Sequence, residues 1–211
     1  MKRKMIFAAL IFTATALTAQ SNLLTDGGFE KMKPGTTNYV LNNSGTNRMT
    51  GFAGRWFLTF AQGGCDNGCC EGNSQITSAE KQEGSNSLTL TINRQTNRND
   101  IKLFQTIKAV ASGVYEVSFW AKCDQDGTPM ALDVLRSDQA STNNGAEPYT
   151  GNYTASTNWK QYKLRVDLTG WTDEERDNMR VSIRPNNNKK LPEGPYPKTF
   201  WIDDISFTKI Q

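Results

Sequence analysis

Aromatic and polar side chains that suit a hydroxyl-rich ligand fall on the outward faces of predicted strands. Apolar and polar residues alternate from Tyr115 to Lys122, and the alternation puts Trp120 on the face opposite the apolar set. The same alternation turns Arg184, Asp133 and Glu116 outward. Sugars offer C–H faces that stack on aromatic rings and hydroxyls that need planar donors and acceptors. The pattern therefore indicates a glycan-binding surface.

Three more aromatic residues are candidates for this surface. Tyr149 and Tyr153 lie in a long polar segment, residues 137–158, and Trp56 precedes a cysteine-rich segment. Long loops on a rigid scaffold are common places for recognition, and tolerated insertions are the alternative. Packing in the core is the alternative for Trp56, and burial under a loop is the alternative for Trp120.

Catalysis has few candidate groups, because the chain contains no histidine. Imidazole acid–base catalysis, Ser-His and Cys-His nucleophiles and imidazole metal ligation are therefore excluded. A glycoside hydrolase needs two carboxylates that face one cleft. Glu116 and Asp133 are the candidates, but no motif supports them, and outward carboxylates on strands are usually solvated. Hydrolysis is the minority interpretation.

The four cysteines are expected to form two disulfides in an exported protein. We expect Cys123 to bond to one of Cys65, Cys69 and Cys70, and the other two to close a small loop. A bond between the neighbours Cys69 and Cys70 is disfavoured because its ring would be strained. The spacing is a poor match to a four-thiolate zinc site.

The first twenty residues read as a secretory signal peptide. Three basic residues precede the apolar run from Met5 to Leu17, which is too short to cross a bilayer as a helix. We therefore expect an exported protein that is periplasmic, cell-surface or extracellular, with no transmembrane segment after cleavage. Of 24 basic residues, removal of these three leaves 21, which balance the 21 acidic residues. Nothing in this balance indicates nucleic acid as a partner.

Short strands with one apolar face dominate residues 21–211. One short helix is expected after Gly170, where Thr172 to Glu175 has the spacing of a capping box. Many short amphipathic strands are typical of an antiparallel sandwich that buries the apolar faces of two sheets against each other. The expected strands are 51–60, 87–92, 101–107, 115–122, 130–135, 162–168, 179–184 and 200–207.

Two segments at opposite ends of the chain carry a family resemblance. They are Asn22-Leu-Leu-Thr-Asp-Gly-Gly-Phe-Glu30 and Phe200-Trp-Ile-Asp-Asp-Ile-Ser-Phe207. They resemble the first and last strands of the galactose-binding-like β-sandwich, and most closely those of carbohydrate-binding modules of families 4, 9 and 22. Residues 80–88 resemble the family's glycine turn, Gln105 followed by residues 113–122 resembles its central strand pair, and residues 159–162 resemble its tryptophan-led strand. The resemblance implies one all-β, jelly-roll domain whose ends pair with each other.

The resemblance also implies a structural calcium ion between the first strand, the glycine turn and the last strand. The matching side chains are Glu30 and Asp203, and the turn Gly84-Ser85 would supply carbonyl oxygens. Asp26 and Asp204 are fallback ligands. The alternative is that these acids pair with lysines or accept backbone N–H bonds. Calcium would serve stability rather than chemistry.

These observations predict a non-catalytic protein that binds a poly- or oligosaccharide. The alternative is a structural or protein-interaction module of the cell envelope, since related sandwiches host many functions. Separate glycan-degrading enzymes or envelope proteins are possible partners. The residues predicted to bind the glycan are Trp56, Trp120, Asp133, Tyr149, Tyr153 and Arg184.

Overall fold

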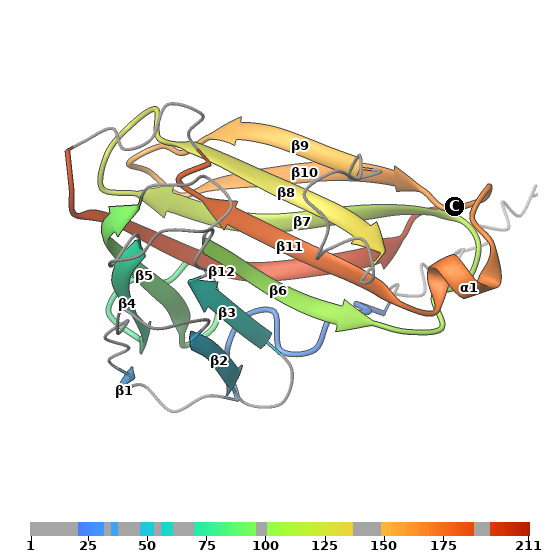
Figure 1. Ribbon diagram of the computed structural model, residues 1–211, viewed down its shortest axis with the longest axis horizontal. Helices are drawn as coiled ribbons and strands as arrows, with labels where there is room; N and C mark the ends of the chain where they lie inside the picture. Colours follow the sequence, from blue (N-terminus) through green and yellow to red (C-terminus); the bar gives the residue numbers. More distant parts are fainter. Residues whose placement is uncertain are drawn as a thin grey trace, which may run out of the picture.

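Two antiparallel sheets pack face to face in the computed structural model (Figure 1). The structure describes residues 21–31, 35–37, 47–52, 56–60, 70–95, 101–136, 149–187 and 195–211. Within this part of the chain each sheet has six strands, and every strand pair is antiparallel. The predicted all-β sandwich is confirmed.

We call the two layers sheet A and sheet B. Sheet A has the strand order β1 (Gly35–Thr37), β4 (Cys70–Thr77), β5 (Ser87–Gln95), β12 (Lys198–Lys209), β7 (Val114–Cys123), β10 (Lys160–Asp167). Sheet B has the order β2 (Asn47–Phe52), β3 (Trp56–Phe60), β6 (Ile101–Ile107), β11 (Met179–Pro185), β8 (Pro129–Arg136), β9 (Tyr149–Thr154).

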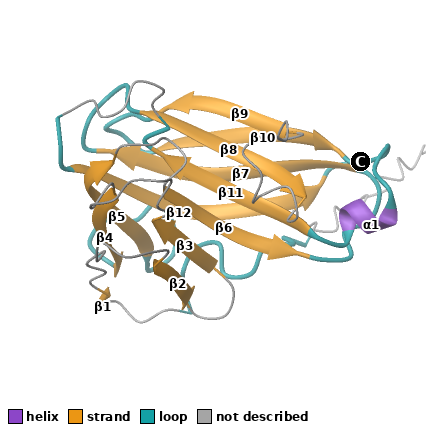
Figure 2. Ribbon diagram, viewed as in Figure 1, coloured by secondary structure: helices purple, strands orange, loops and turns teal. Residues whose placement is uncertain are grey.

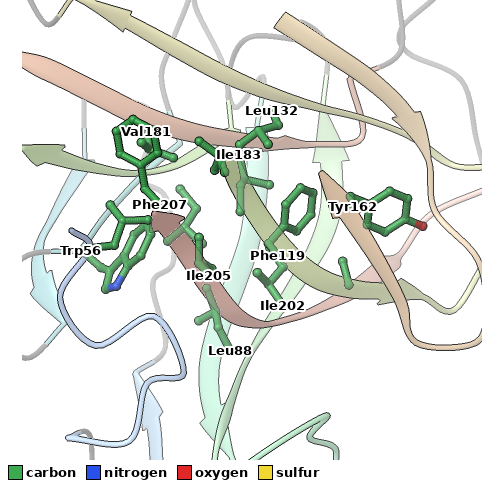
Figure 3. Close-up of a cluster of buried hydrophobic side chains, with 14 of the residues drawn as sticks. Trp56, Leu88, Phe119, Leu132, Tyr162, Val181, Ile183, Ile202, Ile205 and Phe207 are labelled. Carbon is green, nitrogen blue, oxygen red and sulfur yellow. The ribbon is translucent and has the colours of Figure 1, made fainter. Parts of the chain in front are cut away.

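The core lies between the sheets and is built from the alternate inward residues of both (Figure 3). Phe119 and Ile202 come from sheet A, and Leu132 and Ile183 from sheet B; all four are fully buried. Alternation along each strand then leaves the intervening residues on the outer faces. Both outer faces are therefore available for side chains that do not serve the core.

The two ends of the described chain meet, as the resemblance implied. The N–H of Leu23 donates to the carbonyl of Phe207 at 2.9 Å, and the N–H of Ile205 donates to the carbonyl of Gly27 at 3.1 Å. The N-terminal segment contacts β12 through irregular backbone rather than as a regular strand. A bulge in β12 between Asp203 and Ser206 accompanies this contact.

Several local predictions differ from the structure in instructive ways. The expected strand 51–60 is a hairpin of β2 and β3. Strand β4 begins in the cysteine-rich segment that follows Trp56, and β9 forms within the polar segment 137–158. The capping box is confirmed, because Thr172 caps helix α1 (Asp173–Arg176) and Glu175 reciprocates. Figure 2 shows the helix α1 in purple beside the strands of the sandwich. Among the described residues, no helix combines the length and the apolar character needed to cross a membrane.

Cys123 does not form the expected disulfide. Its thiol is free and buried in the core. Strands β5 and β12 lie between β4, which begins at Cys70, and β7. Three strand spacings amount to about 14 Å, whereas bonded cysteines have Cα atoms within about 7 Å. Cys65, Cys69 and the side chain of Cys70 lie outside the described residues.

Candidate functional site

A continuous row of five side chains crosses the outer face of sheet B. Strand registers place each residue directly beside the next, from β3 through β6, β11 and β8 to β9. We call this set the sheet-B row. Its members are Phe57, Phe104, Ser182, Asp133 and Thr150.

The first end of the sheet-B row is aromatic and partly exposed. The rings of Phe57 and Phe104 stack with centroids 5.3 Å apart and an interplanar angle of 19°. The guanidinium of Arg180 lies 4.8 Å from the centroid of Phe104. This cation–π contact fixes the orientation of the ring that it covers. The pair forms a platform on which the C–H face of a ring-shaped ligand can stack.

The other end is polar and buried. Arg184 binds Asp133 through two nitrogens, with Nε to Oδ2 at 2.6 Å and Nη2 to Oδ1 at 2.8 Å. Thr150 Oγ1 donates to Asp133 Oδ1 at 3.0 Å. Asp133 is only 1% exposed and Arg184 5% exposed. A bidentate pair at such burial has one geometry and holds its remaining donors in fixed directions.

Ser182 stands between the aromatic and the polar end. Its hydroxyl oxygen is buried and has no hydrogen-bond partner among the described residues. Leaving a buried hydroxyl without a partner costs about 1–3 kcal/mol. Ser182 is only 1% exposed, so its hydroxyl is an unsatisfied group beneath the surface of this face.

The predicted site residues divide among several places. Asp133 and Arg184 lie together on the outer face of sheet B, as outward alternation implied. Trp120 is partly exposed on the outer face of sheet A, on the other side of the molecule. Trp56 is 1% exposed, donates from its indole N–H to the carbonyl of Asp26 at 3.0 Å and packs on Phe29. Burial in the core removes Trp56 from the candidate site.

Tyr149 and Tyr153 belong to strand β9 rather than to a loop, and both are partly buried. Their registers with Val134 and Met130 turn them toward the core side of sheet B. The Tyr149 hydroxyl donates to the carbonyl of Asp167, and its ring stacks on Trp171.

Tyr153 takes part in a pair of tyrosines between the edge strands. Its hydroxyl donates to the carbonyl of Lys163 at 2.7 Å, and the Tyr162 hydroxyl donates to the carbonyl of Thr154 at 3.0 Å. A cavity of about 500 Å³ between β9 and β10 is lined by both tyrosines. These contacts show a structural role for Tyr153 at this edge.

The two candidate hydrolase acids face opposite sides of the molecule. Glu116 lies on the outer face of sheet A, where it accepts from Lys163 at 2.7 Å. Asp133 lies on the outer face of sheet B. The two sheets are about 10 Å apart and the side chains point away from each other, whereas glycosidase carboxylates lie within about 5–9.5 Å. The expected acid pair is not formed.

Phe57, Phe104 and Ser182 were missed in the sequence, although a signal for two of them was present. Leu103, Gln105 and Ile107 share one face of their strand, so the same alternation puts Phe104 on the other. Ser182 shares the outward face of β11 with Arg184 for the same reason. Phe57 had no such signal, because Trp56 and Leu58 on either side of it are also apolar.

Glu30 and Asp203, the acids implied as calcium ligands, both contact the turn before β5. We call the set formed by Glu30, Asp203 and residues 82–86 the carboxylate clasp. Glu30 Oε1 accepts from the N–H groups of Ser85 at 2.8 Å and Asn86 at 3.1 Å. Asp203 Oδ2 accepts from Gln82 at 2.9 Å and Glu83 at 3.2 Å.

The chemistry of the clasp suits a cation only in part. Burial raises the pKa of Asp203 above its usual value, opposed by its backbone N–H partners, and the neighbouring charge of Asp204 adds to the rise. A calcium ion would relieve this crowding of negative charge, and Glu30 and Asp203 would hold it. However, the described residues contain no group of three acidic or cysteine side chains arranged to hold a metal. Backbone carbonyls would have to complete the coordination.

No family model matches the chain, and no curated protein matches it. Solved structures share its fold. They include the module TmCBM61 in complex with β-1,4-galactotriose, which is 17% identical over 90% of this chain and 99% of the module, with a TM-score of 0.51. A putative sugar-binding protein from Bacteroides thetaiotaomicron VPI-5482 is 16% identical over 90% of this chain and all of that chain, with a TM-score of 0.58.

The same fold also carries enzymes. A cyclase from Fischerella sp. TAU is 11% identical over 90% of this chain and 97% of its own, with a TM-score of 0.58. The expected likeness to carbohydrate-binding modules is thus confirmed for the fold. Function has to be argued from the faces of this sandwich.

Proposed function

We propose that this chain is a non-catalytic carbohydrate-binding protein that binds a poly- or oligosaccharide along the sheet-B row. The observation that carries the proposal is the order of groups in that row: two stacked rings, an unpartnered hydroxyl and a fixed arginine–carboxylate pair. Four strand spacings give the row a length of about 19 Å. This length suits several linked sugar rings lying across the strands.

Each part of the row has a distinct task in binding. The sugar reaches the partly exposed rings of Phe57 and Phe104 first and stacks its C–H face on them. Ser182 is 1% exposed, so its hydroxyl bonds a sugar hydroxyl only after the side chains that cover it move aside. The bond from Arg184 to Asp133 keeps the polar end in one geometry. Because the rings of Phe57 and Phe104 are already held in place, they lose little freedom on binding.

The protein acts outside the cytoplasm, in the periplasm, at the cell surface or in the medium. This part of the proposal is supported by the basic and apolar pattern of residues 1–20. The opposed directions of Glu116 and Asp133 argue against glycoside hydrolysis by that carboxylate pair. A sugar-binding protein of this kind would deliver glycan to separate enzymes or envelope proteins.

The test is binding of the purified protein to a broad glycan array with calcium present. We compare the unchanged protein with Phe104→Ala, which removes one of the two rings of the platform. Trp171→Ala is the matched control, since it removes a partly exposed ring that stacks on Tyr149 away from the row. We expect retention on one glycan class, at least tenfold weaker for Phe104→Ala and unchanged for the control.

Three outcomes would contradict the proposal or a part of it. Retention on no glycan class would favour the protein-interaction module. Equal retention of all three proteins would show that sugar binds away from the sheet-B row. Release of shorter glycans during the binding assay would contradict the non-catalytic part alone.

A further inference from the structure

The outer face of sheet A carries a second row of aromatic side chains. Trp201 of β12 is directly beside Lys122 of β7. Trp159 immediately precedes β10, whose first residue Lys160 is beside Ala121. The ammonium of Lys122 lies 4.7 Å from the centroid of the Trp201 ring and 5.7 Å from that of Trp159. We call these three residues the sheet-A row.

Lys122 is held firmly between the two indoles. Its ammonium binds Glu80 Oε2 at 2.6 Å, and its side chain is 15% exposed. The ion pair neutralises the charge, and the two cation–π contacts limit the rotation of both rings. Trp201 and Trp159 are thus ordered while remaining partly exposed. Ordered aromatic rings lose little freedom when a ligand stacks on them.

The neighbours of the sheet-A row carry hydroxyl and amide groups rather than aliphatic side chains. Strand registers continue the row through Thr89 and Gln75, and Trp120 is flanked by Gln161. The exposed large aliphatic side chains of the described chain, Leu23 and Ile210, lie outside the row. An apolar protein partner would find little to pack against. A ligand with both C–H faces and hydroxyl groups matches the mixture of rings and amides.

We propose that the sheet-A row is a second glycan-binding surface, which takes one side of an extended, uncharged polysaccharide chain. Trp201 and Trp159 are separated by two strand spacings, about 10 Å, so each stacks on a different sugar of the same chain. A neutral chain is the matching ligand because Glu80 already balances Lys122. This surface extends the proposed function to the opposite face of the sandwich.

Two surfaces on opposite sides make the protein bivalent. The two sheets pack against each other through their inner faces. The sheet-A row and the sheet-B row lie on the two outer faces and therefore face away from each other. A single sugar chain therefore binds one row at a time, whereas a network of chains engages both. Avidity on insoluble polysaccharide should exceed affinity for a soluble oligosaccharide of the same composition.

The test measures depletion of the protein by insoluble cellulose, chitin and mannan, three neutral polysaccharides. The double variant Trp159→Ala/Trp201→Ala is compared with Phe104→Ala, which alters the opposite face. Trp201→Tyr keeps a ring and serves as the conservative control. Thermal unfolding of each protein establishes that it is folded.

We expect the double variant to be depleted at least tenfold less by one of the three polysaccharides. Trp201→Tyr should keep most of the binding, and Phe104→Ala should keep part of it. Depletion by none of the three, or equal depletion of the double variant and the unchanged protein, would overturn the second surface. Loss in Phe104→Ala alone would also overturn it while leaving the proposed function intact. If the double variant is unfolded, Trp201→Ala alone, measured in the same way, decides the question.

Discussion

At the residue scale, the Cys123 thiol shows what the core does to a titratable group. Burial raises its pKa from 9.0 to about 11. In the unfolded chain the thiol ionises near pH 9, while the folded chain keeps the proton until about pH 11. The stability from the neutral thiol is therefore fully present below pH 9 and is lost as the pH rises toward 11.

We expect this group to lower the free energy of unfolding by about 2–3 kcal/mol between pH 8 and pH 11. The measurement is urea unfolding of the unchanged protein and of Cys123→Ala at pH 8 and pH 10.5. The variant lacks the thiol, so the stability difference between the two proteins should shrink at the higher pH. If the stability difference between the two proteins is the same at both pH values, burial does not raise the pKa of the Cys123 thiol.

Single outward residues could be predicted from alternation where the neighbouring residues were clearly apolar. Asp133 and Arg184 met this condition, since both strands bury the residues on either side. Trp56 did not, because it is followed by Phe57 and Leu58 and any of the three could face inward. The side of the sandwich on which Trp120 lies could not be read at all. It depends on which sheet each strand joins.

At the element scale, the turn between β4 and β5 is shaped by Gly84, which joins the carboxylate clasp. Gly84 has a φ of 60°, and a Cβ added there would collide with the Glu30 carboxylate. Strain from such a φ costs about 1–2 kcal/mol in a non-glycine residue. Gly84→Ala should therefore cost more than this, because displacement of Glu30 adds to the strain.

Two other glycines separate the cost of a positive φ from the cost of displacing a neighbouring side chain. Gly127 has a φ of 74° but open space around its Cβ position, so Gly127→Ala should cost about 1–2 kcal/mol. Gly170 has open space and no unusual φ, so Gly170→Ala should stay within about 0.5 kcal/mol. Chemical denaturation of the three variants gives the ranking. A cost for Gly84→Ala no larger than for Gly127→Ala would show that Glu30 yields freely.

Whole elements were predictable where one face is strongly apolar, as in β5, β6 and β11. Strand β9 was not, because its sequence from Tyr149 to Thr154 is polar and contains a glycine. Pairing with β8 makes it a strand, and this is tertiary context that overrides local propensity. The glycine in β9 has a packing reason that local propensity does not reveal: a side chain at Gly151 would collide with the Tyr153 hydroxyl.

At the scale of the whole molecule, the carboxylate clasp joins the N-terminal segment to the last strand through the turn before β5. We expect calcium to stabilise this junction and to raise the melting temperature above that in EGTA. At a concentration one hundred times the dissociation constant, a bound ion adds about 2.7 kcal/mol. For a chain of this size, that corresponds to roughly 5–10 °C.

Differential scanning calorimetry in calcium, magnesium and EGTA measures this effect. Glu30→Gln is the control, because it removes one of the two carboxylates and should make the three melting temperatures equal. The same melting temperature for the unchanged protein in calcium and in EGTA would mean that backbone N–H groups alone hold the clasp.

The sandwich itself followed from the number of short amphipathic strands, and the meeting of the two ends followed from the family resemblance. Which residues share a face could not be predicted. Phe57 and Thr150 lie at the two ends of one row although 92 positions separate them in the chain, because long-range pairing brings β3, β6, β11, β8 and β9 side by side. Alternation fixes only the direction of a side chain within its own strand.

The tyrosine pair between β9 and β10 also bears on how copies of this protein behave at high concentration. Both strands lie at the edges of their sheets, where free backbone carbonyls invite a further strand from a neighbouring molecule. Tyr153 and Tyr162 each cap one such carbonyl on the opposite edge, at Lys163 and Thr154. The Tyr149 hydroxyl caps a third carbonyl, at Asp167, so we expect this edge of the sandwich to resist strand addition and the protein to resist fibre formation.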